Sequence, residues 1–259
     1  MMQALEAIIP WAQAGLFASF LVFLRVGAAM ALLPAFGEQS VPAQVRLGLA
    51  LAFTFILVPI VSDLVVPAEN TPSLIGIFVA TEVVIGLTLG IMLRLFVMAL
   101  QIAGSIAAQA TSLSQIFAGA GVEPLPAIGH VLVVSGLALA VMMGLHIHIV
   151  ELFVLSYDIL PPGKFPARET LAQWGIMRVA HAFGLAFTLA APFVIASLIY
   201  NVALGVINKA MPQLMVAFVG APAITAGGLI LLFVAAPLML GIWAGALSGF
   251  LSNPFGTPR

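Results

Sequence analysis

Three charged side chains, Arg25, Glu82 and Arg94, lie inside stretches of sequence that are otherwise apolar over the length of a membrane helix. A charged group costs about 2.5–3.5 kcal/mol at the centre of an inserted helix, so each should face protein, water or a lipid headgroup. On one helix, the spacing of Glu82 and Arg94 gives about 18 Å of rise and about 120° of rotation, so the two cannot pair. Their partners are therefore expected on other helices or other chains.

Two functions are open to these charges. Glu82 could be the carboxylate of an ion or proton path, or all three could make polar contacts between helices or subunits. The second interpretation is favoured, because a relay needs several acidic or His groups in series and only Glu82 is central. Arg46 and His146 are further candidates for polar contacts in the membrane.

The histidines do not form a metal pattern. His146 and His148 lie about 200° apart on a helix, so they cannot share one ion. His148 and Glu151 share a face, but no second such pair completes a bridged site. The chain has no cysteine, and no serine-hydrolase, zinc-protease or phosphate-loop motif occurs. We expect no enzymatic activity, no metal and no cofactor.

Composition sets the class of protein. Of 259 residues, 63% are apolar and 7% are charged, against about 45–50% and about 25% in soluble domains. The mean hydropathy is +1.24. A water-soluble fold is excluded, and a net charge of −1 leaves no basic face for nucleic acid. No positively charged segment precedes the first apolar stretch, which is expected to stay in the mature protein.

About six segments are long and apolar enough to be membrane helices, several of them broken or kinked. We place them at 15–36, 45–67, 73–108, 126–157, 176–207 and 214–251. The stretch after Lys209 contains Pro212, Pro222, Gly227 and Gly228, which predicts a broken or re-entrant helix that becomes straight beyond Gly228. Lys and Arg in the short connectors leave the orientation in the membrane undecided.

Small residues recur at four-residue spacing. The ridge Gly241, Gly245 and Gly249 favours close contact with another helix, because glycine lets two backbones approach. For Gly86 and Gly90, packing and the general abundance of glycine in membrane helices explain the pair equally well. Prolines inside the apolar segments predict curved or broken helices.

Several strings in order resemble the FliR family of flagellar export-gate proteins, whose injectisome counterparts are called SctT. The first block is Arg25-x-Gly27 with Pro34, Val41-Pro42 and Arg46. Further blocks are Ala103-Gly104, Gln109, Pro124, Gly144-Leu145-His146, Ser156-Tyr157, Pro161, Ala191-Pro192, Gly205, Met211-Pro212-Gln213 and FVGAP at 218–222. The sequence departs from the family pattern after Gln109, where a glycine is missing, and after Gln213, where an asparagine is missing.

The resemblance implies a non-enzymatic, all-α subunit of the protein-conducting gate in the bacterial inner membrane, within the flagellar basal body. Such a subunit joins a helical ring with FliP-like and FliQ-like subunits, with an FlhB-like subunit attached, and unfolded export substrates pass through the middle. Residues 1–175 would be the FliP-like portion, and 176–259 the FliQ-like C-terminal hairpin.

The connector 109–127 is rich in Gly, Ala, Ser and Thr and has a single charge, Glu123. Such a loop belongs inside protein or against a cavity. In the family, the loop after the third hydrophobic segment helps to close the pore, so Leu113, Ile116 and Phe117 are the expected closing contacts of a plug. The alternatives are a small secondary transporter that uses Glu82 and Arg94, and an injectisome subunit of the same mechanism.

Overall fold

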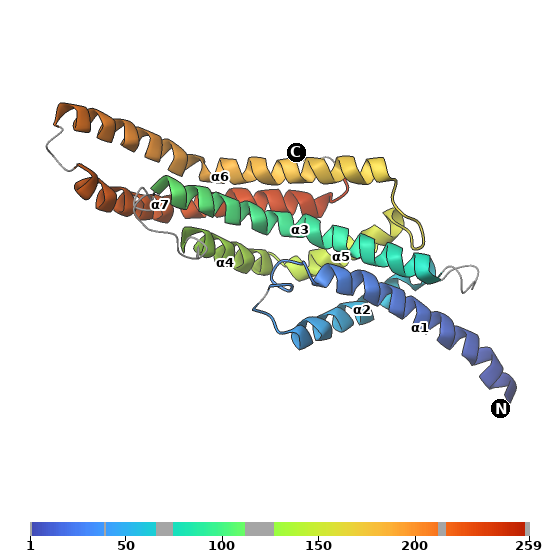
Figure 1. Cartoon of the computed structure of the whole chain (residues 1–259). Coiled ribbons are helices and arrows are strands. Elements are labelled where there is room, and N and C mark those ends of the chain that lie inside the picture. The colour runs from blue at the N-terminus through green and yellow to red at the C-terminus, as the bar shows by residue number, and fades with distance from the viewer. Residues whose placement is uncertain (1, 39, 66–74, 112–126, 212–215, 257–259) are drawn as a thin grey trace. The chain divides into compact units, whose positions relative to one another are not determined.

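The computed structural model describes residues 2–38, 40–65, 75–111, 127–211 and 216–256, and its regular secondary structure there is entirely helical (Figure 1). The helices are α1 (Met2–Met30), α2 (Ala43–Val65), α3 (Ile75–Thr111), α4 (Ala127–Met142), α5 (Leu145–Ile159), α6 (Arg168–Ala210) and α7 (Val216–Ser252). Among the described residues, four helices are long and apolar enough to cross a membrane: α2, α3, α6 and the Ala223–Ser252 part of α7. Helices α4 and α5 would make a fifth span if they are counted together. The predicted all-α membrane class is confirmed.

The helices expose large apolar side chains. Phe55 on α2 is 78% exposed and Phe233 on α7 is 84% exposed. A helix that is apolar on every face is stable only where its surroundings are apolar, in lipid or against other helices. The outer surfaces of α2, α6 and α7 therefore fit a membrane environment.

The chain divides into two compact units, which are described separately. The first holds Met1–Arg94, Val141–Ile176 and Pro254–Thr257, and the second holds Leu95–Ala140, Met177–Asn253 and Pro258–Arg259. In the first unit α1 packs against α2, and α2 packs against α5. Its core includes Leu21, Val26, Leu57, Ile85 and Phe153, all at most 1% exposed.

A tight corner joins α1 to α2. The segment predicted as helix to residue 36 leaves the helix after Met30, because Pro34 disfavours the helical conformation of the residue before it. Ala35 has φ 66°, and Phe36 packs edge-on against Phe53 with ring centroids 6.0 Å apart. A Cβ on Gly37 would lie 2.8 Å from the carbonyl oxygens of Met30 and Ala31, so the corner folds tightly onto the end of α1.

In the second unit, α3, α4 and α7 meet through one tryptophan and small residues. The indole N–H of Trp243 donates to the carbonyl oxygen of Phe96 at 2.8 Å. A Cβ on Gly104 would come within 2.2 Å of the Cα of Gly129, so the backbones of α3 and α4 touch there. Gly136 leaves room for Leu100 and the Trp243 ring.

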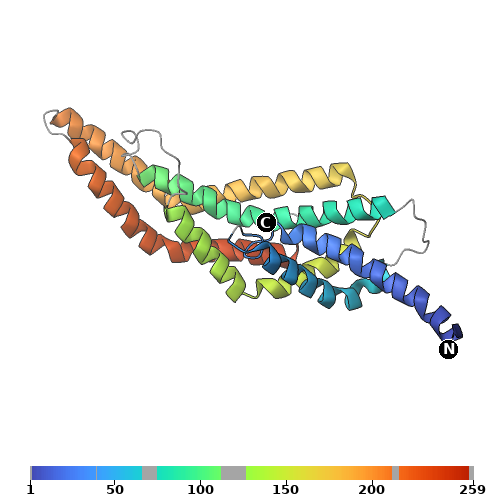
Figure 2. The same ribbon diagram turned by 60° about the horizontal axis from the view of Figure 1, so that its bottom comes forward.

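Two segments differ from the sequence-based expectation in where the helix is broken. The segment 126–157 is two helices, because Gly144 takes the left-handed conformation with φ 80° and its N–H bonds the carbonyl oxygen of Val141, a common end for a helix. Conversely, α7 continues through Gly227, Gly228 and Pro237 as one bowed ribbon (Figure 2). In apolar surroundings the helix is the conformation that satisfies its own backbone groups, so glycine and proline are tolerated.

Candidate functional site

The first unit contains a buried ion pair between two helices that lie far apart in the sequence. Arg25 on α1 donates from Nε to Glu82 Oε2 at 2.7 Å and from Nη2 to Glu82 Oε1 at 2.9 Å. Both side chains are 0% exposed. The planar guanidinium fork matches the two carboxylate oxygens, which is the strongest geometry for such a pair. The interpretation of Arg25 and Glu82 as a contact between helices is therefore supported by their geometry.

Helix α5 completes this site, which we call the Arg25 cluster: Arg25, Glu82, Ser156, Tyr157 and the carbonyl of Leu160. Arg25 Nη1 donates to Ser156 Oγ and Nη2 donates to the carbonyl oxygen of Leu160, both at 2.9 Å. The Tyr157 hydroxyl donates to Glu82 Oε2 at 3.2 Å. The guanidinium carbon lies 3.7 Å from the Tyr157 ring centroid, close enough for cation–π attraction. The cluster thus ties α1, α3 and α5 together.

The side chains of the Arg25 cluster are occupied by hydrogen bonds to one another. Four of the five N–H groups of Arg25 are used, and both oxygens of Glu82 accept hydrogen bonds. Ser156 also donates to the carbonyl oxygen of Phe153 at 2.7 Å. A carboxylate held this way, out of contact with solvent, is poorly placed to bind a substrate ion or to pass on a proton.

A second contact fixes the turn after α5. The N–H of Gly163 donates to Thr81 Oγ1 at 3.1 Å, and Thr81 directly precedes Glu82 on α3. Gly163 has φ 75°, and a Cβ there would lie 2.6 Å from the Phe78 ring. Only glycine combines a positive φ with the absence of a side chain that would clash with Phe78. Glycine at this position therefore lets the turn lie close against α3, beside the Arg25 cluster.

Sequence reasoning did not single out Ser156 and Tyr157 as partners of Arg25. Their signal was present in the sequence, since a serine and a tyrosine adjoin each other in a helix of mostly apolar residues. A buried hydroxyl needs a partner, and an unpaired intramembrane arginine elsewhere in the chain is the partner it would seek.

The other predicted polar residues are dispersed. Arg94 on α3 pairs through Nη1 with Glu38 of the corner between α1 and α2, and both are partly exposed. Arg46 donates to the carbonyl oxygen of Val41 at 3.2 Å, a contact at the start of its own helix. His146 is exposed on α5 and makes no polar side-chain contact with the described residues.

His148 and Glu151 do form the expected pair on one helix face, with Nδ1 and Oε2 3.0 Å apart. Both are exposed, so the pair contributes little to stability. Among the residues that the structure describes, no three His, Cys, Asp or Glu side chains gather closely enough to hold a metal ion.

The two glycine patterns differ in what lies beside them. A Cβ on Gly86 would lie 2.2 Å from the carbonyl oxygen of Arg25, and one on Gly90 would lie 2.8 Å from that of Ala29. Helix α1 therefore packs against α3 at this pair, one turn from the Arg25 cluster. At Gly241, Gly245 and Gly249, no atom of the described chain comes within 4 Å of an added Cβ. Within the described chain, no other helix packs closely against this ridge. That the ridge packs against another subunit stays a prediction.

The expected plug residues Leu113, Ile116 and Phe117 lie outside the described residues.

Comparisons with known proteins agree on one family. Residues 16–250 match the model of "Bacterial export proteins, family 1". The chain is 35% identical over 231 residues to the flagellar biosynthetic protein FliR of Caulobacter vibrioides, which covers 88% of this chain and 91% of that protein. It is 29% identical to the FliR protein of Escherichia coli (85% of this chain, 84% of that protein). It is 28% identical to that of Bacillus subtilis (85% and 86%).

Proposed function

Because the chain belongs to the FliR family of bacterial export proteins, we propose that this component of the flagellar export apparatus forms part of the wall and the plug of the protein-export gate. The observation that carries the proposal is the family match, which runs over nearly the whole apolar chain, from residue 16 to residue 250. The gate would lie in the bacterial inner membrane, at the flagellar basal body, and pass unfolded flagellar proteins.

The Arg25 cluster suits a wall subunit. It fixes α1, α3 and α5 to one another by hydrogen bonds from the fully buried side chain of Arg25 to Glu82, Ser156 and the carbonyl of Leu160. A wall beside a passing polypeptide must hold its shape while substrates of many sequences move past it. A saturated, buried network gives that rigidity without offering a free charge to bind the substrate.

The plug belongs to the connector 109–127. Leu113, Ile116 and Phe117 would close the pore by packing apolar side chains across it, because a narrow apolar constriction expels water and so stops ions. An entering polypeptide would displace them.

The partners in this proposal are FliP-like and FliQ-like subunits and an FlhB-like subunit. Residues 1–175 would take the FliP-like place in the ring, and 176–259 would take the FliQ-like place. The exposed apolar faces of α6 and α7 and the ridge Gly241, Gly245 and Gly249 supply surface for such neighbours.

The transporter alternative gains no support from the charges. Arg25 saturates the carboxylate of Glu82, and Arg94 pairs with Glu38 at a corner. An injectisome subunit would share the mechanism proposed here and differ in its substrates.

A pull-down in gentle detergent tests the proposal. The tagged chain, expressed in cells that contain the rest of the export apparatus, should be recovered in a large complex whose intact mass includes FliP-like and FliQ-like chains. Recovery of a monomer or homodimer alone from such cells would overturn the gate function.

A further inference from the structure

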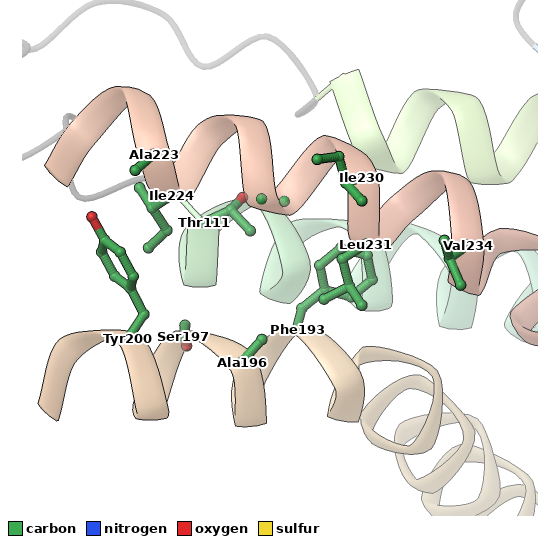
Figure 3. A pocket seen from close by; sticks show the side chains of 12 residues that line it. Thr111, Phe193, Ala196, Ser197, Tyr200, Ala223, Ile224, Ile230, Leu231 and Val234 are labelled. Atoms are coloured by element: carbon green, nitrogen blue, oxygen red, sulfur yellow. The ribbon is translucent and has the colours of Figure 1, made fainter. Parts of the chain in front are cut away.

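A cavity of about 420 Å³ lies in the second unit between α6 and α7, beside Thr111, the last residue of α3 (Figure 3). Its size is within the range of about 300–1,000 Å³ that is typical of ligand pockets. Phe193 and Tyr200 extend from α6 toward α7, and Ile224 and Leu231 extend from α7 toward α6 (Figure 3). The space is thus built by three helices.

The lining is almost entirely apolar. The hydroxyl of Thr111 donates to the carbonyl oxygen of Ala107 at 3.0 Å, and that of Ser197 donates to the carbonyl oxygen of Val194 at 3.0 Å. Both groups are thereby bonded to their own helices. Tyr200 carries the third hydroxyl of the lining, and a pocket with so few polar groups favours apolar ligands.

The surface around the cavity is apolar as well. Ile230 and Val234, which line it, are 66% and 68% exposed. Helix α6 has no Asp, Glu, Lys or Arg from 179 to 208, and the described part of α7 has none. Such a surface suits a hydrocarbon environment, so a lipid tail is a fitting occupant of the part of α6 and α7 that no neighbouring subunit covers.

Lys209 supplies a charge at a suitable distance. It is exposed near the end of α6, and at 1.5 Å per residue it lies about 14 Å along the helix beyond Tyr200. The hydrocarbon depth of one leaflet is about 15 Å, half of a bilayer core. A lipid phosphate beside Lys209 would therefore place its tail along α6 at the level of the cavity.

We propose that this cavity binds one acyl chain of a membrane phospholipid whose phosphate group pairs with Lys209. The cavity accepts the lipid tail, and the ammonium group of Lys209 accepts the phosphate. The described parts of α6 after Glu169 and of α7 contain no carboxylate that would repel the phosphate. This assigns a lipid site to a chain whose proposed function is to line a protein channel, and it does not depend on that function.

Gly227 offers a way to fill the cavity. It lines the space, and a Cβ there would meet no described atom within 4 Å. At the neighbouring Gly228, a Cβ would lie 2.6 Å from Thr111 Cγ2. Gly227→Leu should therefore occupy the cavity without pushing α7 away from α3. The matched control is Gly184→Leu on α6, which also has no atom within 4 Å of an added Cβ and lies outside the cavity.

The experiment is native mass spectrometry of the full-length chain in mild detergent, titrated with dioleoyl phosphatidylglycerol. The wild type and Gly184→Leu should retain one phospholipid under conditions that remove the others. Gly227→Leu should bind it at least tenfold more weakly. Lys209→Gln, which leaves the cavity intact, should weaken binding about fivefold, and Lys164→Gln, a change of the chain's other lysine, should leave it unchanged.

Equal retention by the wild type and Gly227→Leu would overturn the proposal. A second result would also overturn it: a purified complex in which the wild-type chain carries no phospholipid and in which Gly227→Leu loses partner chains. The cavity would then be an interface with another protein. Failure of the lipid site leaves the pull-down of the wild-type chain unaffected, so the two proposals fail separately.

Discussion

At the residue scale, the Arg25 cluster explains how an arginine can be fully buried in a chain with so few charges. The guanidinium bonds Glu82, Ser156 and the carbonyl of Leu160, so its desolvation is compensated by hydrogen bonds rather than by one Coulomb pair. The consequence is a network in which no member can be removed alone without leaving a buried polar group unsatisfied.

Removing either charge should therefore cost more than removing both. Arg25→Met or Glu82→Leu alone should lower the free energy of unfolding by about 3–5 kcal/mol, since each leaves one buried charge unpaired. The double variant, Arg25→Met with Glu82→Leu, should be more stable than either single variant. Thermal unfolding of the purified chain in detergent measures this, and additive losses in the double variant would contradict it.

Ala35 provides a second prediction at this scale. An L-residue with φ 66° is strained by about 1–2 kcal/mol. Ala35→Gly should remove that strain and stabilise the chain by about 1 kcal/mol. The same change at Ala52, an exposed residue inside α2, should destabilise it by about 1 kcal/mol. A shift of the same sign for both variants in the unfolding midpoint would show that the corner is not strained.

At the scale of the elements, apolar runs predicted where helices lie better than where they end. The all-α class follows directly from runs of about 20 apolar residues without charge. The break at Gly144 and the continuity through Gly227 and Gly228 were missed, because one glycine takes a positive φ and the others remain helical. Local sequence does not distinguish these cases, since the neighbouring helices decide which conformation satisfies the backbone.

The type of contact in the candidate site could be predicted from the sequence, but the residues that form it could not. Arg25 and Glu82 were expected to contact other helices because a lone intramembrane charge is costly. That they bond each other depends on α1 packing against α3 at Gly86, a contact between residues far apart in the sequence. One sequence contains no distance information of that kind.

The two glycine patterns should respond differently to substitution. Gly86→Ala places a Cβ 2.2 Å from the carbonyl oxygen of Arg25 and should lower the unfolding free energy of the isolated chain by about 1–3 kcal/mol. Gly245→Leu has open space in the described chain, so it should leave that stability unchanged and block assembly with other subunits. Unfolding midpoints and the yield of the complex measure the two effects. Normal complex yield from Gly245→Leu would mean that the ridge faces lipid or space.

At the scale of the whole molecule, the chain is apolar outside as well as inside, and the Arg25 cluster is a small polar network within an apolar core. Large apolar side chains are exposed on every helix, among them Phe55 on α2, Phe187 on α6 and Phe233 on α7, where lipid or other subunits can cover them. A chain of this kind is expected to do its work as part of an assembly, so the sharpest test of the proposed plug needs the proposed gate in assembled form.

Phe117→Ala should make the closed gate leak ions while leaving assembly intact, because a smaller side chain weakens the apolar seal. Phe117→Leu, which keeps an apolar side chain of similar reach, should leak much less. Conductance of the purified gate in planar bilayers, with complex yield as a control, measures the effect. Unchanged conductance in Phe117→Ala would remove the plug assignment.

The sequence separation within the Arg25 cluster has a consequence for biogenesis. Arg25 and Glu82 are 57 residues apart, and a ribosome adds about 5–20 residues per second. At that rate, the arginine waits about 3–11 s for its carboxylate to be synthesised, and longer for Ser156 on α5. During that interval the first helix carries an uncompensated charge that opposes entry into the bilayer. The nascent α1 can therefore reach its final place, with Arg25 fully buried, only after α3 has been synthesised.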